Sequence, residues 1–149
     1  MSYFGAQVQV ARKIKEELEH AGLSVWMDEG QFGRNDVYFA AVDYGMRSSQ
    51  VVVALISDAY ASKPIHQKEI NLCDGLRKYA ISFIVTPGAT FPPMGMMGPI
   101  LAPHPVFDLS AADDSGFNST FQGAFATLQS FVLNACDSCE RLRRLWLLD

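Results

Sequence analysis

Three kinds of side chain in this sequence have the reactivity that chemistry requires: cysteines, histidines and carboxylates. Cys136 and Cys139 form a CxxC pair, but the only other cysteine is Cys73 and there is no second pair. A structural zinc ion needs four ligands, so the pair predicts ordinary thiols and no metal site. An odd cysteine count in a chain without a secretion-signal pattern predicts reduced thiols and a cytoplasmic protein.

Among the carboxylates, Glu69 is the strongest candidate because of where the fold should place it. Its helix, expected over residues 58–79, follows a continuously apolar and mostly β-branched stretch at residues 51–56. Such a stretch is typical of a strand buried on both faces of a parallel sheet. Other polar residues on the same helix leave a solvated surface carboxylate as the alternative, and His66, one turn earlier, is expected to be exposed.

The rest of the sequence predicts alternating helices and strands. Helical periodicity is expected over residues 7–21, 36–47 and 119–133, and shorter strands over 23–27, 81–85 and 106–109, after a first strand that ends at Tyr3 and begins before this sequence. Strands alternating with helical crossovers predict an α/β fold, with helices on both faces of a parallel sheet. Five such strands suit a flavodoxin-like sheet in the order 2-1-3-4-5. We expect one domain over residues 1–135 and a C-terminal helical tail over 136–149.

This strand order predicts where a ligand binds. The order reverses between the strand that ends at Tyr3 and the strand at residues 51–56, and ligands of such sheets bind beyond the carboxyl ends of the strands at that point. The segments that reach it are the residues after Tyr3, the polar loop at residues 28–36, and Ser57 onward into the helix that carries Glu69. The fold alone therefore places Glu69 at the expected site.

Composition excludes two classes of function. The chain has 149 residues, 49% of them hydrophobic, which is typical of a folded domain. Its net charge of −4 lacks the basic field that nucleic-acid binding needs. No apolar run approaches the roughly 20 residues of a membrane-spanning helix. We therefore expect neither a nucleic acid nor a membrane as partner.

Several segments, in this order and spacing, resemble the TIR (Toll/interleukin-receptor) domain. They are SY at 2–3, GLSVWMDEG at 22–30, SSQVVVALISDAY at 48–60, HQKEI at 66–70 and ISFIVTP at 81–87. The resemblance covers residues 2–87 and implies the flavodoxin-like fold already expected from the pattern. Some TIR domains are adaptors that assemble signalling complexes. Others cleave NAD⁺ to nicotinamide and ADP-ribose or a cyclic ADP-ribose.

In the TIR enzymes a glutamate on the third helix is essential, within a pattern like W-x-x-x-E. Glu69 falls at that position, and Ile65 stands where the pattern has tryptophan. The BB loop, which follows the second strand and here spans residues 28–36, carries its glycines at Gly30 and Gly33 rather than near Asn35. The resemblance implies partners through this loop, either further copies of the chain or other TIR domains.

The resemblance and the switch point together give a set of candidate site residues. Glu69 is the catalytic candidate. The substrate-binding candidates are Tyr3, Phe4, Gly5, Asp28, Gly33, Tyr38, Ser57 and Ile65. Tyr3 and Phe4 could stack on a ring of the substrate or pack in the core, and Ser57 could cap a helix or contact phosphate. NAD⁺ would be a substrate, so no cofactor is expected.

The reaction that this family catalyses needs only one carboxylate. Nicotinamide leaves NAD⁺ as a neutral molecule, so no general acid is required, and the transition state resembles an oxocarbenium ion. A single glutamate near the ribose can stabilise that charge. The leading hypothesis is thus an NAD⁺ glycohydrolase or cyclase in immune or cell-death signalling. A non-catalytic module that self-assembles through the BB loop is the alternative, and a nucleotide-binding sensor without turnover is a weaker third.

Overall fold

The computed structural model describes residues 5–27, 35–110, 114–134 and 144–148. At its centre is a five-stranded sheet with the spatial order β1-β5-β2-β3-β4. Its strands are β1 (Ser24–Met27), β2 (Val51–Ile56), β3 (Tyr79–Ile84), β4 (Val106–Asp108) and β5 (Arg144–Leu148). All neighbouring strands run parallel. The predicted α/β class with a parallel sheet is therefore confirmed.

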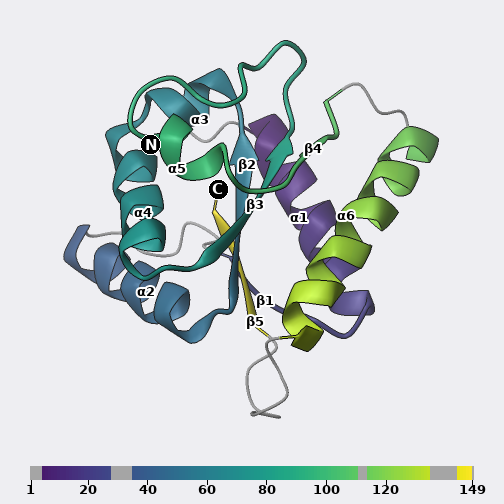
Figure 1. The fold of residues 1–149 in the computed structure, drawn as a ribbon, viewed down its shortest axis with the longest axis horizontal. Coiled ribbons are helices and arrows are strands. Elements are labelled where there is room, and N and C mark those ends of the chain that lie inside the picture. Colours follow the sequence, from purple (N-terminus) through teal and green to yellow (C-terminus); the bar gives the residue numbers. More distant parts are fainter. Residues whose placement is uncertain (1–4, 28–34, 111–113, 135–143, 149) are drawn as a thin grey trace.

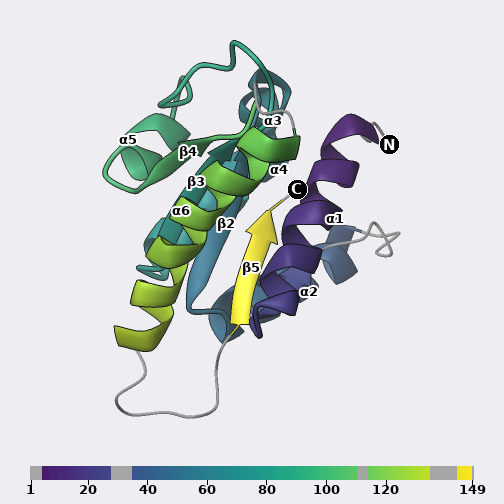
Figure 2. The same ribbon diagram turned by 90° about the vertical axis from the view of Figure 1, so that its right-hand side faces the viewer.

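Helices cover both faces of this sheet, as predicted. They are α1 (Gly5–His20), α2 (Asn35–Ser48), α3 (Asp58–Ser62), α4 (Pro64–Gly75), α5 (Met97–Leu101) and α6 (Asp114–Asn134). Helices α1 and α6 lie on one face, and α2, α4 and α5 lie on the other (Figure 1). Figure 2 looks onto the face covered by α1 and α6, and β5 is visible between these two helices.

Strand β2 contributes side chains to the cores on both faces of the sheet, because successive side chains point to opposite faces. All six of its residues are buried, which confirms the strand predicted at residues 51–56. Val51, Val53 and Leu55 join the core under α1 and α6, whereas Val52, Ala54 and Ile56 join the core under α2, α4 and α5. Burying each large aliphatic side chain stabilises the fold by about 1.5–3 kcal/mol. This double core fixes the strand from which α3 and α4 emerge.

The predicted order 2-1-3-4-5 is not confirmed, because the second place in the sheet is filled by a different strand. The strands β1, β2, β3 and β4 have the relative places expected of them. The place between β1 and β2, predicted for the strand that ends at Tyr3, is filled by β5. Tyr3 itself lies outside the described residues. An interior strand of a sheet covered on both faces is typically apolar, and the last four residues of the sequence RLWLL are apolar.

The prediction of a helical tail is wrong for residues 144–148. These residues form β5, which pairs with β1 from Ser24↔Arg144 to Met27↔Leu147. A short apolar run cannot be assigned to helix or strand from periodicity alone. Here the two open edges of β1 and β2 offer backbone hydrogen bonds that favour the strand. A short helix, α5, lies between β3 and β4, where no helix was expected.

Candidate functional site

The candidate site begins where β2 ends. Ser57 follows Ile56 and caps α3, because its Oγ accepts a hydrogen bond of 3.0 Å from the backbone N–H of Tyr60. This short helix ends at Lys63, and α4 begins at Pro64. Proline suits a first helical position because its missing N–H is not needed there. The helix expected over residues 58–79 is thus divided into α3 and α4, and α4 carries Glu69.

Helical spacing turns Glu69 inward. Ile65, Glu69 and Cys73 recur every four residues on α4 and so share one stripe of the helix. Cys73 is fully buried, Ile65 is half-buried, and the side chain of Glu69 is only 3% exposed. The alternative of a solvated surface carboxylate is therefore wrong. A carboxylate buried to this extent needs hydrogen-bond partners, since an unpaired buried charge is very costly.

Both oxygens of the Glu69 carboxylate have such a partner. The hydroxyl of Tyr38, on α2, donates a hydrogen bond to Oε1. The Nδ1 atom of His66, one turn earlier on α4, lies 3.2 Å from Oε2. Hydrogen bonds to a charged group stabilise a fold by about 1.5–3 kcal/mol each. Two helices thus hold a single buried carboxylate in one orientation.

His66 is the residue that sequence reasoning missed. It was expected to be exposed, yet its side chain is only 15% exposed. Its ring stacks on the buried ring of Tyr60, with centroids 4.4 Å apart and planes 17° apart. The spacing of three residues between His66 and Glu69 was a usable signal, because i,i+3 neighbours meet on a helix. What the sequence could not show was Tyr60, which comes from α3.

The structure brings only some of the predicted site residues together. Tyr38 contacts Glu69 directly, and Ile65 lies one turn before it on the same stripe of α4. Ser57 acts as the cap of α3, which is one of its two predicted roles. Gly5 is the first residue of α1, which lies on the face of the sheet opposite to α2 and α4. Tyr3, Phe4, Asp28 and Gly33 lie outside the described residues.

A second contact joins α2 to α4 beside the carboxylate. The Nζ atom of Lys68 lies 5.5 Å from the ring centroid of Phe39, within the range of a cation–π interaction. Phe39 in turn meets Tyr38 edge-to-face, with ring centroids 5.5 Å apart. The position of α2 against α4 therefore decides whether Tyr38 reaches Glu69.

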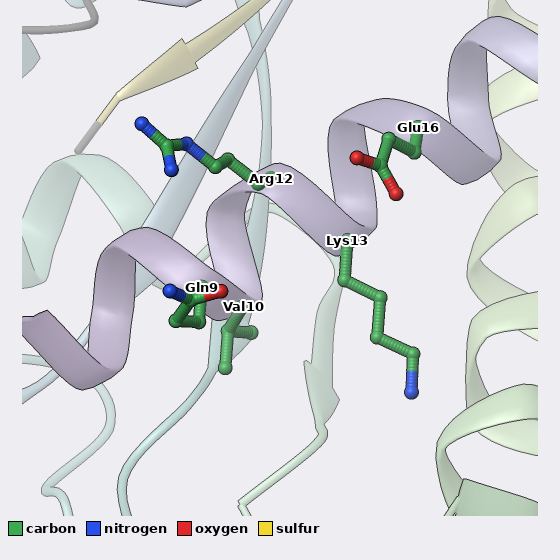
Figure 3. A pocket seen from close by; sticks show the side chains of 5 residues that line it. All are labelled: Gln9, Val10, Arg12, Lys13 and Glu16. Carbon is green, nitrogen blue, oxygen red and sulfur yellow. The ribbon is translucent and has the colours of Figure 1, made fainter.

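The described part of the chain offers neither a metal site nor a convergent pocket. No group of three or more His, Cys, Asp or Glu side chains is arranged there to hold a metal ion. The cysteines of the CxxC pair are not among these residues. A hollow beside α1 is lined by Gln9, Val10, Arg12, Lys13 and Glu16 (Figure 3). All five come from one helix, and the three charged ones differ in sign, so they do not converge on a ligand.

Comparison with known families identifies the class of protein. A family model described as "TIR domain" matches residues 1–121. The chain therefore belongs to the TIR domain family, as its resemblance predicted. This family serves signalling and contains both NAD⁺-cleaving enzymes and non-catalytic adaptors. Searches among curated proteins and among solved structures returned no match. No helix in the described ranges is long and apolar enough to cross a membrane.

Proposed function

We propose that this domain cleaves the bond between nicotinamide and ribose in NAD⁺, with Glu69 as the catalytic carboxylate. The observation that carries the proposal is the buried carboxylate of Glu69, oriented by Tyr38 and His66. Charged side chains are rarely buried, so a carboxylate that two helices bury and orient supports a functional role. NAD⁺ is then a substrate, and no cofactor is part of the proposal.

The proposed chemistry breaks one bond. The C1′–N bond of NAD⁺ cleaves, its electron pair goes to the nicotinamide nitrogen, and nicotinamide leaves as a neutral molecule. The ribosyl group develops an oxocarbenium charge, as in glycoside hydrolysis. Glu69 stabilises that charge without transferring a proton. Water then attacks C1′ and releases a proton to give ADP-ribose, or a nucleophile of the same molecule attacks to give a cyclic product.

A carboxylate held in advance is well suited to this step. Electrostatic stabilisation of a transition state is strongest where the charged group is already oriented and shielded from water. Removing one such group typically costs 10²–10³-fold in kcat. Glu69 meets both conditions, because His66 holds one of its oxygens and the side chain is almost fully buried. The substrate must therefore reach it through a movement of the helices that cover it.

The test is nicotinamide release by the purified protein, at high concentration or assembled on beads. Wild type should consume NAD⁺, and Glu69→Gln should release nicotinamide at least about a hundredfold more slowly. Asp74→Asn is the matched control, since Asp74 is an exposed carboxylate on the same helix. Its rate should equal that of wild type. Absence of nicotinamide release from assembled wild-type protein would refute the proposal.

A second candidate, a non-catalytic interaction module, is favoured by the surface of α2. Val37 and Tyr44 lie on one face of this helix and are 53% and 66% exposed. Exposed apolar side chains of this size, directly after the BB loop, suit binding to another TIR domain or a further copy of the chain. Under this candidate Val37→Asp disrupts assembly measured by light scattering, whereas Glu69→Gln does not. In either case we expect the protein to act in cytoplasmic signalling of immune or cell-death type.

A further inference from the structure

The two partners of Glu69 are attached to the protein in different ways. His66 lies three residues before Glu69 on α4, so it moves with the carboxylate whenever that helix moves. Tyr38 lies on α2, 31 residues away in sequence, and α2 is a separate helix that follows the BB loop. A shift of α2 against α4 therefore separates Tyr38 from Glu69 but leaves His66 in place.

Tyr38 offers Glu69 the same chemistry that a ribose offers. Its hydroxyl is an O–H donor to a carboxylate oxygen, and so is each hydroxyl of the ribose in NAD⁺. The Glu69 side chain is only 3% exposed, so a ribose cannot contact it while α2 stays where it is. Exchange of one O–H donor for another keeps the carboxylate hydrogen-bonded throughout. The position of the Tyr38 hydroxyl is thus a natural place for a ribose hydroxyl.

His66 has the features of a fixed support. Its ring stacks on Tyr60, which is 2% exposed and part of the core under α2, α4 and α5. A carboxylate oxygen accepts only, so the 3.2 Å contact is a hydrogen bond when Nδ1 carries the proton. The stacked ring aims Nδ1 at Oε2 and leaves Oε1 for the other donor. This arrangement orients the carboxylate even when Tyr38 is absent.

We propose that the Tyr38 hydroxyl is a displaceable cover, which occupies the place of a ribose hydroxyl on Oε1 of Glu69, and that His66 is the positioning residue that holds Oε2. The inference rests on the proposed NAD⁺ cleavage and deepens it. In the resting domain Tyr38 closes the site. Movement of α2 withdraws the phenol, the ribose takes its place, and His66 keeps the carboxylate oriented for the reaction.

The two residues should therefore respond to substitution in opposite ways. Tyr38→Phe keeps the ring and removes the competing hydroxyl, so it should lower KM by about two- to tenfold without loss of kcat. His66→Phe keeps the stacking and removes the donor, so it should lower kcat by about ten- to a hundredfold with little change in KM. His66→Asn, which places an amide N–H near the position of Nδ1, should recover part of that kcat.

Matched controls exist for both changes. Arg47→Gln changes an exposed side chain at the end of the same helix, and His20→Phe replaces an exposed histidine at the end of α1. Neither should change kcat or KM. Loss of kcat in Tyr38→Phe would overturn the proposal, because the hydroxyl would then act in the reaction itself. Unchanged kcat in His66→Phe would overturn the positioning role.

A readout without turnover separates this proposal from the proposed function. The ¹⁵N shifts of His66 should show a proton on Nδ1, and they should change in Glu69→Gln but much less in Arg47→Gln. When NAD⁺ is titrated into the wild-type domain, the Tyr38 ring resonances should shift. The proton on Nδ1 of His66 should stay in place. If NAD⁺ binds but no nicotinamide is released, the catalytic proposal fails. The role of Tyr38 as a cover is then supported if Tyr38→Phe binds NAD⁺ more tightly than wild type, and refuted if it does not. If NAD⁺ does not bind to wild type or to Tyr38→Phe, both proposals fail.

Discussion

The phenol of Tyr38 and the carboxylate of Glu69 are joined by a hydrogen bond between two helices, α2 and α4. With His66 on the other oxygen, this contact makes a buried acidic group part of the packing between those helices. The same carboxylate is therefore expected to affect stability as well as activity, and its variants must be chosen with that in mind.

Substitutions of Glu69 should differ in stability. Glu69→Ala removes one hydrogen-bond partner from Tyr38 and one from His66, and should cost about 1–3 kcal/mol. Glu69→Gln keeps a carbonyl oxygen for Tyr38 and should cost about 1 kcal/mol. Urea unfolding followed by circular dichroism measures both. Equal stability of Glu69→Ala and wild type would show that the two contacts are not formed in solution.

Gly98 should tolerate no larger side chain. A Cβ atom at this position would lie 2.4 Å from the backbone oxygen of Pro93, and backbone cannot move aside cheaply. We expect Gly98→Ala to destabilise the fold by about 1–3 kcal/mol. Gly123, on the exposed side of α6, has no atom within 4 Å of the corresponding Cβ position. Gly123→Ala should instead stabilise the fold by about 0.5–1 kcal/mol. Thermal unfolding of both variants measures this difference. If the two substitutions change stability in the same direction, the prediction is wrong.

Cys73 should make stability depend on alkaline pH. Burial raises the pKa of its thiol from an ordinary 9.0 to about 12, with the charge of Asp74 adding to the rise. Between these values the unfolded chain loses the proton and the folded chain keeps it, so stability is full below about pH 9 and falls as pH rises towards 12. Cys73→Ala should remove this part of the decline. A slope between pH 9 and 11 that is unchanged in the variant contradicts the burial of the thiol.

Strand β5 should protect its two neighbours from hydrogen exchange. Trp146 pairs with Trp26 of β1 and with Val52 of β2, so its backbone lies in the middle of the sheet. Trp146→Pro removes a backbone donor and should cost about 1–3 kcal/mol and expose the amides of β1 and β2. Trp146→Phe keeps the donor and serves as the control. Equal protection of β1 and β2 in both variants would mean that β5 does not occupy this place.

Much of the fold could be predicted because its signals are local. The run at residues 51–56 is continuously apolar and mostly β-branched. This pattern indicates a strand buried on both faces, and β2 is that strand. Pro64 marks the start of α4 because proline fits a first helical turn and interrupts a longer helix. The inward stripe through Ile65 and Glu69 likewise follows from helical spacing.

The rest depends on partners far apart in the sequence. The place between β1 and β2 is filled by the apolar segment that pairs best with both strands. No local pattern shows whether residues 144–148 form a strand or a helix. The burial of His66 depends on Tyr60, and the orientation of Glu69 on Tyr38, which is 31 residues away. Glu69 could be proposed as a candidate from the sequence, but the groups that hold it could not.

Release of nicotinamide from NAD⁺ by the concentrated, assembled domain tests the central claim most directly. Wild type and Asp74→Asn should release it at equal rates, and Glu69→Gln, confirmed as folded by circular dichroism, at least about a hundredfold more slowly. Equal rates in wild type and Glu69→Gln, or no release from any of the three proteins, would contradict the assignment of Glu69 as the catalytic carboxylate.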